Sequence, residues 1–285
     1  MKTFSNKVAA ITGAGSGMGR ALAVALANRG CHLAISDVNG EALEATAAQL
    51  DSARVNVSRH VLDVADQDAV FTFASATERD HGKVNLVFNN AGVSVTDSVE
   101  HMSYKDFEWL MNINFWGVVH GCKAFLPLLK RVDEGHIINT SSIFGVIAVP
   151  SQSAYNASKF AVRGFSEALR QELQDSHIGV TCVQPGGVKT NIVKTSRYYP
   201  QDNAAPTKEE AAATFESIAA LSSTEAAEII LHGVAKNRAR VLVGKDAKLI
   251  DWVARIFPQR YPVIMQWLSA RMGADQLTRG AKNDS

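Results

Sequence analysis

Short apolar runs alternate with longer helical segments along most of this chain, and that alternation restricts the fold more than any other feature. The apolar runs lie at residues 7–12, 31–36, 57–64, 84–90, 136–142, 179–184 and 240–244. Most of them are continuously apolar, as expected for parallel strands that are covered on both faces. Helical patterns fill the intervals at residues 17–29, 40–51, 66–80, 104–130, 155–175 and 224–237. We therefore predict an α/β fold with a doubly wound parallel sheet of about seven strands and helices on both faces.

Two regions depart from this alternation. Residues 191–223 begin as a polar loop and become alanine-rich and helical, and residues 246–285 follow the last predicted strand. Neither region shows an internal repeat or the boundary of a second domain. A length of 285 residues is common for one α/β domain. We expect residues 1–245 to form a single domain and residues 246–285 to be a helical extension of it.

The overall composition argues against some classes of partner. The 29 basic and 28 acidic side chains give a formal charge of +1, so no global field attracts nucleic acid. Cys31, Cys122 and Cys182 stand far apart in apolar surroundings, which predicts buried free thiols, a reducing compartment and no metal site. The sequence shows no secretory signal and no apolar run long enough to span a bilayer. These features predict a cytoplasmic protein.

A glycine-rich turn, TGAGSGMGR at residues 12–20, joins the first strand to the first helix. Glycines permit positive φ angles and let backbone N–H groups approach a pyrophosphate at the helix N-terminus. The turn therefore indicates a Rossmann-type dinucleotide site, although such a turn can also be purely structural. The residues expected to line the site are Thr12, Gly13, Ser16, Gly17, Met18 and Gly19.

Asp37 ends the second predicted strand, where a carboxylate can accept hydrogen bonds from the adenosine ribose. No arginine or lysine stands beside it in the sequence SDVNG, so a 2′-phosphate would meet an unneutralised carboxylate. This favours NAD over NADP. The alternative interpretation is that Asp37 caps the next helix or supports the turn.

Two further strand ends carry residues suited to a cofactor. Asp63 and Val64 end the third strand, where they could bracket an adenine, and NNAG ends the fourth at residues 89–92. In that loop Asn90, Ala91 and Gly92 are expected to contact the cofactor. Asparagine and glycine are also ordinary turn residues, which is the simpler alternative for this loop.

The stretch SAYNASKF at residues 153–160 places Tyr155 and Lys159 about one helical turn apart on the same face. An unperturbed tyrosine has a pKa of about 10 and is hardly ionised at neutral pH. A nearby ammonium stabilises the phenolate and so lowers the pKa of the phenol. Taken alone, a partly exposed tyrosine beside a solvated lysine would be the simpler interpretation.

Together and in this order, the motifs resemble those of the short-chain dehydrogenase/reductase family. The matching elements are TGxxxGxG at Thr12–Gly19, NNAG at 89–92, N-x-x-G at Asn114–Gly117, Ser142, YxxxK at Tyr155–Lys159 and PG-x-x-x-T at Pro185–Thr190. Spacing within the motifs favours Asn114 over Asn112. The thirteen residues from Ser142 to Tyr155 favour Ser142 over Ser141, which we expect to be a hydrogen-bonded neighbour. The resemblance covers about residues 5–245 and implies a Rossmann-fold dehydrogenase domain over residues 1–245.

The resemblance implies a role for each catalytic residue. Tyr155 would be the general acid or base, and Lys159 with an oxidised nicotinamide would lower its pKa by ~2–3 units. Lys159 would also hold the nicotinamide ribose. Ser142 would donate a hydrogen bond to the substrate oxygen, and Asn114 would anchor a water molecule. Further cofactor contacts are implied for Pro185, Gly186, Val188 and Thr190.

The substrate is expected to lie under the segment after Thr190, so residues 191–223 are predicted to form a lid. Apolar side chains in this segment and at nearby strand ends favour a hydrophobic secondary alcohol or ketone. The predicted lid side chains are Ile192, Val193, Tyr198, Tyr199, Phe215 and Ile218. The predicted pocket residues are Ser94, Ile143, Phe144, Gly187 and Tyr198, with Val93 and Val188 as further apolar walls.

Several functions are compatible with these residues. The leading one is an NAD-dependent alcohol dehydrogenase or ketone reductase, and the nearest alternative uses NADP on a steroid, retinoid or aryl ketone. A catalytically weak NAD(H)-sensing regulator would keep the fold without turnover, but all four catalytic residues are present. An isomerase or dehydratase would show no net change in the nicotinamide. The resemblance also implies a homodimer or homotetramer paired through the helices 104–130 and 155–175.

The tail at residues 246–272 predicts an amphipathic helix that is broken at Pro258 and a second one after Pro262. Basic residues accompany its apolar side chains: Lys248, Arg255, Arg260 and Arg271. The tail could pack on the domain or a partner subunit, roof the substrate site, or make peripheral contact with a membrane surface. Interspersed aspartates count against the membrane alternative.

Overall fold

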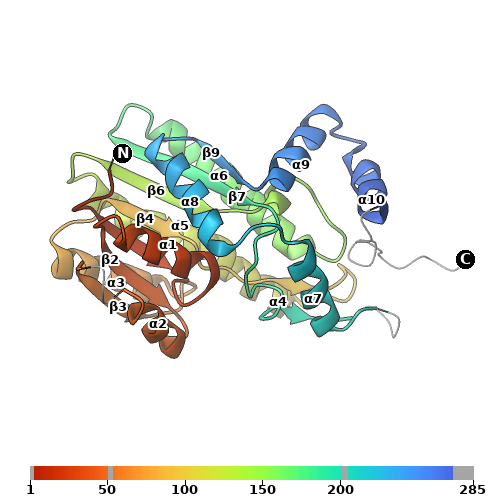
Figure 1. The fold of residues 1–285 in the computed structure, drawn as a ribbon, viewed down its shortest axis with the longest axis horizontal. Helices are drawn as coiled ribbons and strands as arrows, with labels where there is room; N and C mark the ends of the chain where they lie inside the picture. Colours follow the sequence, from red (N-terminus) through yellow and green to blue (C-terminus); the bar gives the residue numbers. More distant parts are fainter. Residues whose placement is uncertain (1–2, 51–53, 201–204, 272–285) are drawn as a thin grey trace, which may run out of the picture.

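The computed structural model describes residues 3–50, 54–200 and 205–271. Its centre is a seven-stranded parallel sheet in the order β3-β2-β1-β4-β6-β7-β9, shown with its flanking helices in Figure 1. The strands are β1 (Val8–Thr12), β2 (His32–Asp37), β3 (Val57–Val61), β4 (Leu86–Asn89), β6 (Gly135–Thr140), β7 (Ile178–Pro185) and β9 (Arg240–Val243). The predicted α/β fold with a doubly wound sheet is confirmed.

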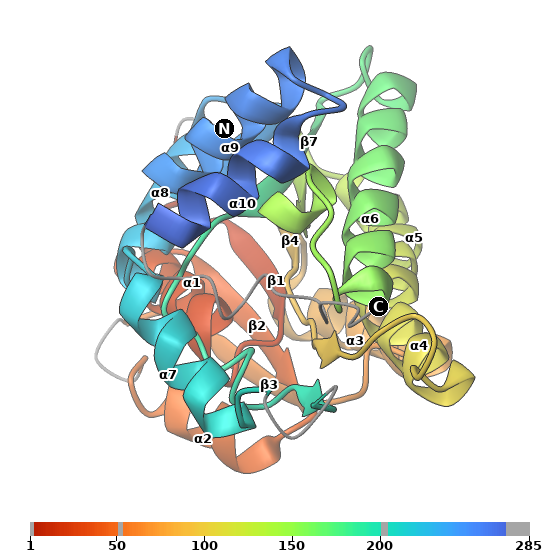
Figure 2. The ribbon, with the colours of Figure 1, turned by 90° about the vertical axis from the view of Figure 1, so that its right-hand side faces the viewer.

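Helices cover both faces of this sheet. The α-helices of the described residues are α1 (Gly17–Ala27), α2 (Gly40–Ala47), α3 (Gln67–His81), α4 (Tyr104–Met111), α5 (Gly117–Leu129), α6 (Ser153–Glu172), α7 (Lys208–Ile218), α8 (Ser223–Ala235), α9 (Lys245–Ile256) and α10 (Tyr261–Arg271). Helices α1, α2 and α8 pack on one face, and α3, α5 and α6 pack on the other (Figures 1 and 2). Successive strand residues feed the two cores in turn: Ile11 joins the core with α1, and Ala10 joins the core with α5.

The predicted helix 104–130 is interrupted. After α4, residues Asn112–Trp116 form a π-helical turn, and α5 then begins at Gly117. The Asn114 side chain is hydrogen-bonded to the backbone of Val93. A Cβ at Gly117 would lie 2.8 Å from a methyl carbon of Val64. Both contacts hold this turn against the loops after β3 and β4, and π-helical turns of this kind are frequent at functional sites.

The segment 191–223 contains a short strand and a helix. Strand β8 (Arg197–Tyr198) pairs in parallel with β5 (Val95–Thr96). The sequence did not reveal this pairing, because two residues are too few to leave a periodic pattern. The predicted alanine-rich helix is α7, which begins at a capping box formed by Thr207 and Glu210.

The two predicted tail helices are present as α9 and α10, separated by residues 257–260, which include Pro258. Because α9 follows directly on β9, it begins at the carboxyl edge of the sheet (Figure 2). Across the described ranges, no helix is long and apolar enough to cross a membrane. The last part of the predicted extension, residues 272–285, lies outside the described residues.

Candidate active site

The loops predicted to bind the cofactor emerge at one edge of the sheet, because the strands that precede them are parallel. The Thr12 hydroxyl at the end of β1 accepts hydrogen bonds from the backbone N–H groups of Asn90 at 3.0 Å and Ala91 at 3.1 Å. The Asn90 side-chain amide donates to the Thr12 carbonyl oxygen at 3.1 Å. The glycine turn and the NNAG loop are therefore fastened to each other.

The glycine turn has the geometry that its sequence predicts. Gly13 and Gly17 have φ angles of +66° and +50°, in the region that favours glycine. A Cβ at Gly19 would lie 2.0 Å from the Gly13 carbonyl oxygen, so only glycine lets α1 approach the end of β1 this closely. Ser16 is exposed, and its side chain makes no capping hydrogen bond within the described structure. The first N–H groups of α1 thus remain available to an anion.

Asp37 lies beside this turn at the end of β2. One carboxylate oxygen accepts the backbone N–H of Gly15 at 2.8 Å, and the other accepts that of Asn39 at 2.9 Å. Each oxygen has a second lone pair for a further donor. Arg20 was not predicted to have a role in the turn. Its guanidinium donates to the Gly15 carbonyl oxygen and supports the turn.

These residues fit a bound dinucleotide. A Cβ at Gly17 would lie 3.4 Å from the Thr190 side chain, so the loop after β7 closes on the glycine turn. The Oδ1 atom of Asn90 is buried and has no hydrogen-bond partner among the described residues. The site therefore combines helix N–H groups suited to a phosphate, a carboxylate that can accept hydroxyl donors and an amide oxygen that can accept one more donor.

Asp63 and Val64, predicted near the adenine, also make contacts within the protein. The Asp63 carboxylate accepts the backbone N–H of Ala65 at 2.9 Å. Val64 is buried, and its side chain faces the small surface of Gly117. Both residues therefore shape the loop between β3 and α3.

Tyr155 lies in the first turn of α6 and is 9% exposed. Its ring packs edge-on against Phe144, with ring centres 6.1 Å apart. The Ser142 hydroxyl lies beside the phenol and favours its ionised form. Ser142 in turn accepts the backbone N–H of Phe144 at 3.1 Å. The loop after β6 therefore positions both the ring and the hydroxyl of Tyr155.

Lys159 lies one helical turn further along α6 and is 2% exposed. Its Nζ donates to the Thr140 carbonyl oxygen at 3.0 Å and lies 5.6 Å from the centre of the Tyr155 ring. The Ser141 hydroxyl donates to the Lys159 carbonyl oxygen at 2.7 Å, as expected for a hydrogen-bonded neighbour. The structure thus brings Tyr155, Lys159 and Ser142 together at the end of β6.

Asn114 is fully buried in the π-helical turn. Its Oδ1 accepts the backbone N–H of Val93 at 2.8 Å, and its Nδ2 donates to the Val93 carbonyl oxygen at 3.0 Å and to Ser158 Oγ at 3.2 Å. A Cβ at Gly92 would lie 3.2 Å from Asn114 Oδ1 and 3.4 Å from Lys159 Nζ. Asn114 and Lys159 therefore approach the same point beside Gly92.

Burial sets the pKa values of the central pair. It raises the pKa of Tyr155 to about 12, and the hydrogen bond with Ser142 opposes this rise only in part. Burial also lowers the pKa of Lys159 to about 8. The expected lowering of the Tyr155 pKa is therefore not produced by the residues of the chain alone. Loss of hydration on burial is the largest cause of the rise.

Asn156 stands next to the tyrosine in the sequence and was missed. Its Nδ2 donates to the carbonyl oxygens of Phe144 at 2.8 Å and Ile147 at 2.9 Å, and its Oδ1 accepts the backbone N–H of Val149 at 3.1 Å. Asn156 thereby ties the loop after Ser142 to α6. An asparagine at a buried helical position was the available signal, since buried amides must find partners.

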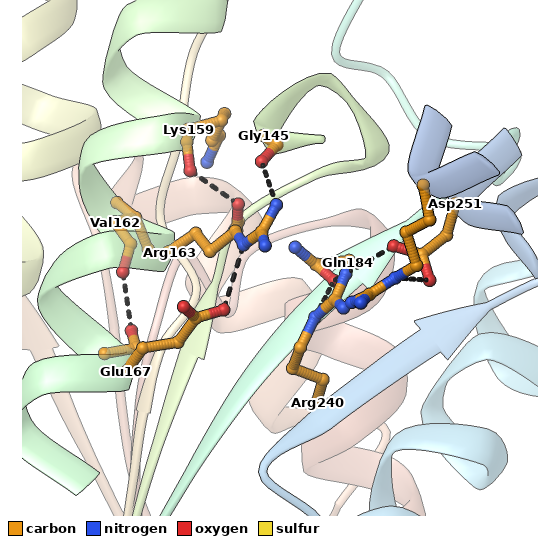
Figure 3. Close-up of polar contacts among 11 residues, drawn as sticks. Gly145, Lys159, Val162, Arg163, Glu167, Gln184, Arg240 and Asp251 are labelled. Atoms are coloured by element: carbon orange, nitrogen blue, oxygen red, sulfur yellow. Dashed lines mark hydrogen bonds and ion pairs between the residues drawn. The ribbon is translucent and has the colours of Figure 1, made fainter. Parts of the chain in front are cut away.

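Arg163 fastens the same loop two turns further along α6. Its guanidinium donates to the Gly145 carbonyl oxygen at 3.4 Å and pairs with Glu167 at 2.9 Å, as Figure 3 shows. A Cβ at Gly145 would lie 2.6 Å from the Lys159 carbonyl oxygen, so the loop and the helix are in close contact here.

Asp246, in the first turn of α9, is a further residue that the sequence did not reveal. Its Oδ2 accepts the backbone N–H of Gly187 at 2.6 Å. A Cβ at Gly186 would lie 2.1 Å from the same oxygen, so glycine is required at that position. Val188, the next predicted cofactor contact, is buried. The tail helices therefore support the loop after β7.

Comparison with known proteins identifies the family. Residues 7–200 match the sequence profile of the family described as short chain dehydrogenase. The chain belongs to the short-chain dehydrogenase family. A protein of Mycobacterium tuberculosis named as an oxidoreductase, SadH, is 46% identical over 264 residues, covering 92% of this chain and 94% of the relative. Human estradiol 17-beta-dehydrogenase 11 is 28% identical over 272 residues, covering 93% of this chain and 84% of the relative.

A solved structure agrees with this assignment. The short-chain dehydrogenase/reductase of Burkholderia phymatum, crystallised in complex with NAD, superimposes with a TM-score of 0.79 and 31% sequence identity. The match covers 99% of this chain and 100% of that protein. The likeness therefore extends over the tail as well as over the sheet.

In this short-chain dehydrogenase, apolar side chains surround Tyr155. The cluster consists of Val93, Val95, Met102, Trp109, Leu110, Phe144, Ala154 and Ile192. Val93, Phe144 and Ile192 were predicted as pocket or lid residues, and the structure brings them together. Trp109 and Met102 were missed, because helical spacing alone does not distinguish a pocket wall from ordinary packing.

The remaining predicted pocket residues have partners in the protein. Ile143 is buried beside Phe144, and Ser94 donates to Gln152 at 3.4 Å. The hydroxyl of Tyr198 donates to the Pro206 carbonyl oxygen at 2.7 Å. A separate pocket between Thr190 and α7 is lined by Lys189, Thr190, Asn191, Val193, Lys194, Ala212, Phe215 and Glu216.

The segment 191–223 is fastened to α4. Arg197 Nη1 pairs with Asp106 at 2.6 Å, and the Arg197 guanidinium lies 3.6 Å from the centre of the Trp109 ring. The Ser103 hydroxyl donates to the same carboxylate at 2.7 Å. The hydrogen bonds from Ser103 and Arg197 hold the pKa of Asp106 below its ordinary value. This contact joins the segment to the apolar cluster around Tyr155.

Proposed function

We propose that this short-chain dehydrogenase is an NAD-dependent oxidoreductase that interconverts a hydrophobic secondary alcohol and the corresponding ketone. The observation that carries the proposal is the buried grouping of Tyr155, Ser142 and Lys159. A general acid or base must lie within hydrogen-bond reach of the oxygen whose proton it transfers. The Ser142 hydroxyl lies beside the phenol of Tyr155, so we expect both hydroxyls to reach one substrate oxygen.

Each residue of the group has a distinct task. Tyr155 Oη takes the proton of the alcohol during oxidation and returns it to the ketone oxygen during reduction. Ser142 Oγ donates a hydrogen bond to the same oxygen, where negative charge develops. When bound, NAD supplies the hydride acceptor and, in its oxidised form, the positive charge that a phenol with a pKa of about 12 still requires.

Lys159 and Asn114 support this proton transfer. With a pKa of about 8, Lys159 is mostly protonated at neutral pH and keeps a cation beside the phenol. Its Nζ lies next to Gly92, where it can also hold the nicotinamide ribose. Asn114 fixes the loop at Val93 and is proposed to anchor a water molecule that links Lys159 to solvent.

The Asp37 carboxylate is proposed to select NAD over NADP. Its two oxygens can accept further donors from the ribose hydroxyls, whereas a 2′-phosphate would be repelled. The NAD in the Burkholderia structure supports this choice. The proposed cofactor residues are Thr12, Gly13, Ser16, Gly17, Met18, Gly19, Asp37, Asp63, Val64, Asn90, Ala91, Gly92, Pro185, Gly186, Val188 and Thr190, together with Tyr155 and Lys159.

A hydrophobic substrate is supported by the apolar cluster that includes Tyr155 and Phe144. The name of the human relative refers to the 17-beta position of a steroid, which agrees with this class. Residues 191–223 are proposed to close over the substrate as a lid. We also infer a homo-oligomer, because Trp116 and Phe160 on the predicted pairing helices are 47% and 41% exposed. The buried free thiols support a cytoplasmic location.

The test is a panel of steroid, retinoid, aryl and alkyl alcohols and ketones, followed by the absorbance of the reduced nicotinamide. We expect turnover of hydrophobic compounds and faster reaction with NAD(H) than with NADP(H). NADH binding without turnover of any compound would instead identify a sensor. Conversion of a compound without a net absorbance change would identify an isomerase or dehydratase.

A further inference from the structure

Helix α9 exposes an apolar stripe to solvent. Its residues recur every three or four positions and are 52%, 56% and 50% exposed: Leu249, Trp252 and Ile256. The buried residues of the helix are Ala247, Asp251 and Val253. A helix on a globular domain normally turns its large apolar side chains inward. In α9, Leu249, Trp252 and Ile256 instead point to solvent and are not packed against the rest of the domain.

The apolar surface continues beyond α9. Phe257, in the turn that follows, is 41% exposed, and Val263 on α10 is 69% exposed. We refer to Lys248, Leu249, Trp252, Arg255, Ile256 and Phe257 as the α9 surface.

Basic side chains accompany this stripe, while the two acidic residues in 245–260 are turned inward. Lys245, Lys248, Arg255 and Arg260 are exposed. Asp246 accepts the Gly187 N–H. Asp251 lies between Arg240 at 2.7 Å and Arg255 at 2.9 Å, as Figure 3 shows for the Arg240 contact. One carboxylate between two guanidinium groups leaves that trio with an excess positive charge.

The contacts of Asp246 and Asp251 show that these aspartates do not oppose a membrane contact. Both carboxylates are engaged inside the protein, so the α9 surface presents apolar and cationic groups only. A chain with a formal charge of +1 concentrates four exposed cations along this short stretch. Tryptophan and aliphatic side chains next to lysine and arginine are the composition that binds in the headgroup region of anionic bilayers.

We propose that the α9 surface docks on the surface of an anionic lipid membrane. A second copy of the chain fits less well, because two such surfaces face to face would bring cations against cations. An anionic bilayer offers both complementary partners at once: headgroups for the cations and acyl chains for Trp252 and its neighbours. The contact is peripheral, since no helix in the described residues spans a membrane.

The docked orientation would bring the carboxyl edge of the sheet towards the lipid. The first residue of α10, Tyr261, accepts the backbone N–H of Ala148 through its hydroxyl at 3.1 Å. Ala148 lies in the loop between Ser142 and Tyr155, so the tail helices adjoin the proposed active site (Figure 2). A hydrophobic substrate could then enter directly from the bilayer, a consequence that rests on the proposed function. The docking proposal does not depend on the proposed function.

The test is co-sedimentation of the full-length protein with lipid vesicles, which needs neither cofactor nor substrate. One set of vesicles contains phosphatidylcholine alone, and the other contains equal parts of phosphatidylcholine and phosphatidylglycerol. We expect binding to the anionic vesicles, little binding to the neutral ones, and weaker binding when salt rises from about 0.05 M to about 0.5 M.

Two variants locate the contact. Lys248→Gln should weaken binding to anionic vesicles about fivefold, and Trp252→Ala should weaken it about tenfold. The control for Lys248→Gln is Lys83→Gln, because Lys83 is exposed near the amino edge of the sheet. The control for Trp252→Ala is Tyr104→Ala, because Tyr104 is exposed on α4. Both controls should bind like the unaltered protein. Thermal unfolding midpoints of all four variants confirm that they are folded.

Three results would overturn the proposal. The first is absence of binding to anionic vesicles by the unaltered, folded protein. The second is equal loss of binding in the control variants, which would show a contact elsewhere. The third is a Trp252→Ala variant whose oligomer has a lower mass than that of the unaltered protein, while neither protein binds vesicles. This result would identify the α9 surface as an interface between copies of the chain. Failure to find a turned-over substrate affects the proposed function but none of these measurements.

Discussion

The carboxylate of Asp246, at the start of α9, accepts a hydrogen bond from the backbone N–H of Gly187 across 2.6 Å. The loop that contains Gly187 also reaches the glycine turn, where Thr190 approaches Gly17. Helix α9 is therefore coupled to the cofactor side of the site through one partly buried contact. A helical extension that lies outside the seven-stranded sheet thus supports a loop proposed to bind NAD.

Replacing Asp246 with alanine should weaken cofactor binding. The Gly187 N–H would lose a charged acceptor, and the loop would lose its support. We expect the KM for NAD to rise about tenfold with little change in kcat, because hydrogen bonds to charged groups contribute about 1.5–3 kcal/mol. Steady-state kinetics with varied NAD provide the measurement. Asp175→Ala, an exposed aspartate before β7, is the control; an equal KM in both variants would contradict the coupling.

Replacing Tyr155 with phenylalanine should abolish most turnover while leaving the fold intact. The ring still packs against Phe144, but the proton donor is lost. We expect kcat to fall about 100- to 10,000-fold, the usual contribution of a general acid or base. NADH affinity, measured by fluorescence titration, should stay within about twofold. Tyr104→Phe, at an exposed position on α4, should behave like the unaltered enzyme. Unchanged turnover in Tyr155→Phe would exclude the proposed proton transfer.

The parts of the fold that follow from local patterns were predictable. Continuous apolar runs indicated the parallel strands, and the glycines of the first turn indicated its positive φ angles at Gly13 and Gly17. The grouping of Ser142 with Tyr155 and Lys159 was implied by the resemblance to the short-chain dehydrogenase/reductase family, and parallel strands deliver their loops to one edge. These features depend on interactions between residues close in sequence or on one general topological rule.

The parts that depend on long-range contacts were not predictable. Asp246 bonds to Gly187 from a position 59 residues away, and Arg197 reaches Asp106 across 91 residues. Burial raises the pKa of Tyr155 in the chain without cofactor, and sequence spacing does not report this loss of hydration. Exposure of Trp252 could not be read from an amphipathic pattern either. Such a pattern gives two faces without saying which one is buried.

Asp37→Asn should shift the cofactor preference towards NADP. The amide keeps the shape of the carboxylate and removes the charge that would repel a 2′-phosphate. We expect the ratio of kcat/KM for NADP to that for NAD to rise about tenfold or more, because like charges interact strongly at short range. Both cofactors are compared at one substrate concentration. Asp68→Asn, exposed in the first turn of α3, is the control. No change in the ratio would assign Asp37 to a purely structural role.

Arg197→Lys should loosen the segment 191–223 without affecting the cofactor. Lysine keeps the charge but loses the planar stacking on Trp109, which lies 3.6 Å from the guanidinium. We expect the KM for a hydrophobic substrate to rise about fivefold while NADH affinity is unchanged. Arg59→Lys, in an exposed ion pair with Glu44, is the matched control. If NADH affinity fell by the same factor by which the KM for the substrate rose, residues 191–223 would not act as a lid over the substrate alone.

Lys159 predicts a specific dependence of stability on pH. Its pKa is about 8 in the folded protein, against 10.5 for an ordinary lysine. Below pH 8 the lysine is charged in both states, so the cost of burying the ammonium is fully present. Between pH 8 and 10.5 the folded protein releases this proton before the unfolded chain does. The Lys159 contribution to the free energy of unfolding therefore rises with pH, by at most about 1.4 kcal/mol per pH unit.

Urea unfolding of the unaltered protein and of Lys159→Met measures this contribution. The measurements are made from about pH 7.5 to about pH 9.5, below the pH at which Tyr155 ionises in the unfolded chain. Tyr155 has a raised pKa, so its effect runs in the opposite sense and lowers stability above pH 10. The buried cysteines titrate alike in both proteins and cancel in the difference. The unaltered protein should therefore gain stability relative to Lys159→Met as pH rises. A constant difference would mean that the ammonium at position 159 remains hydrated.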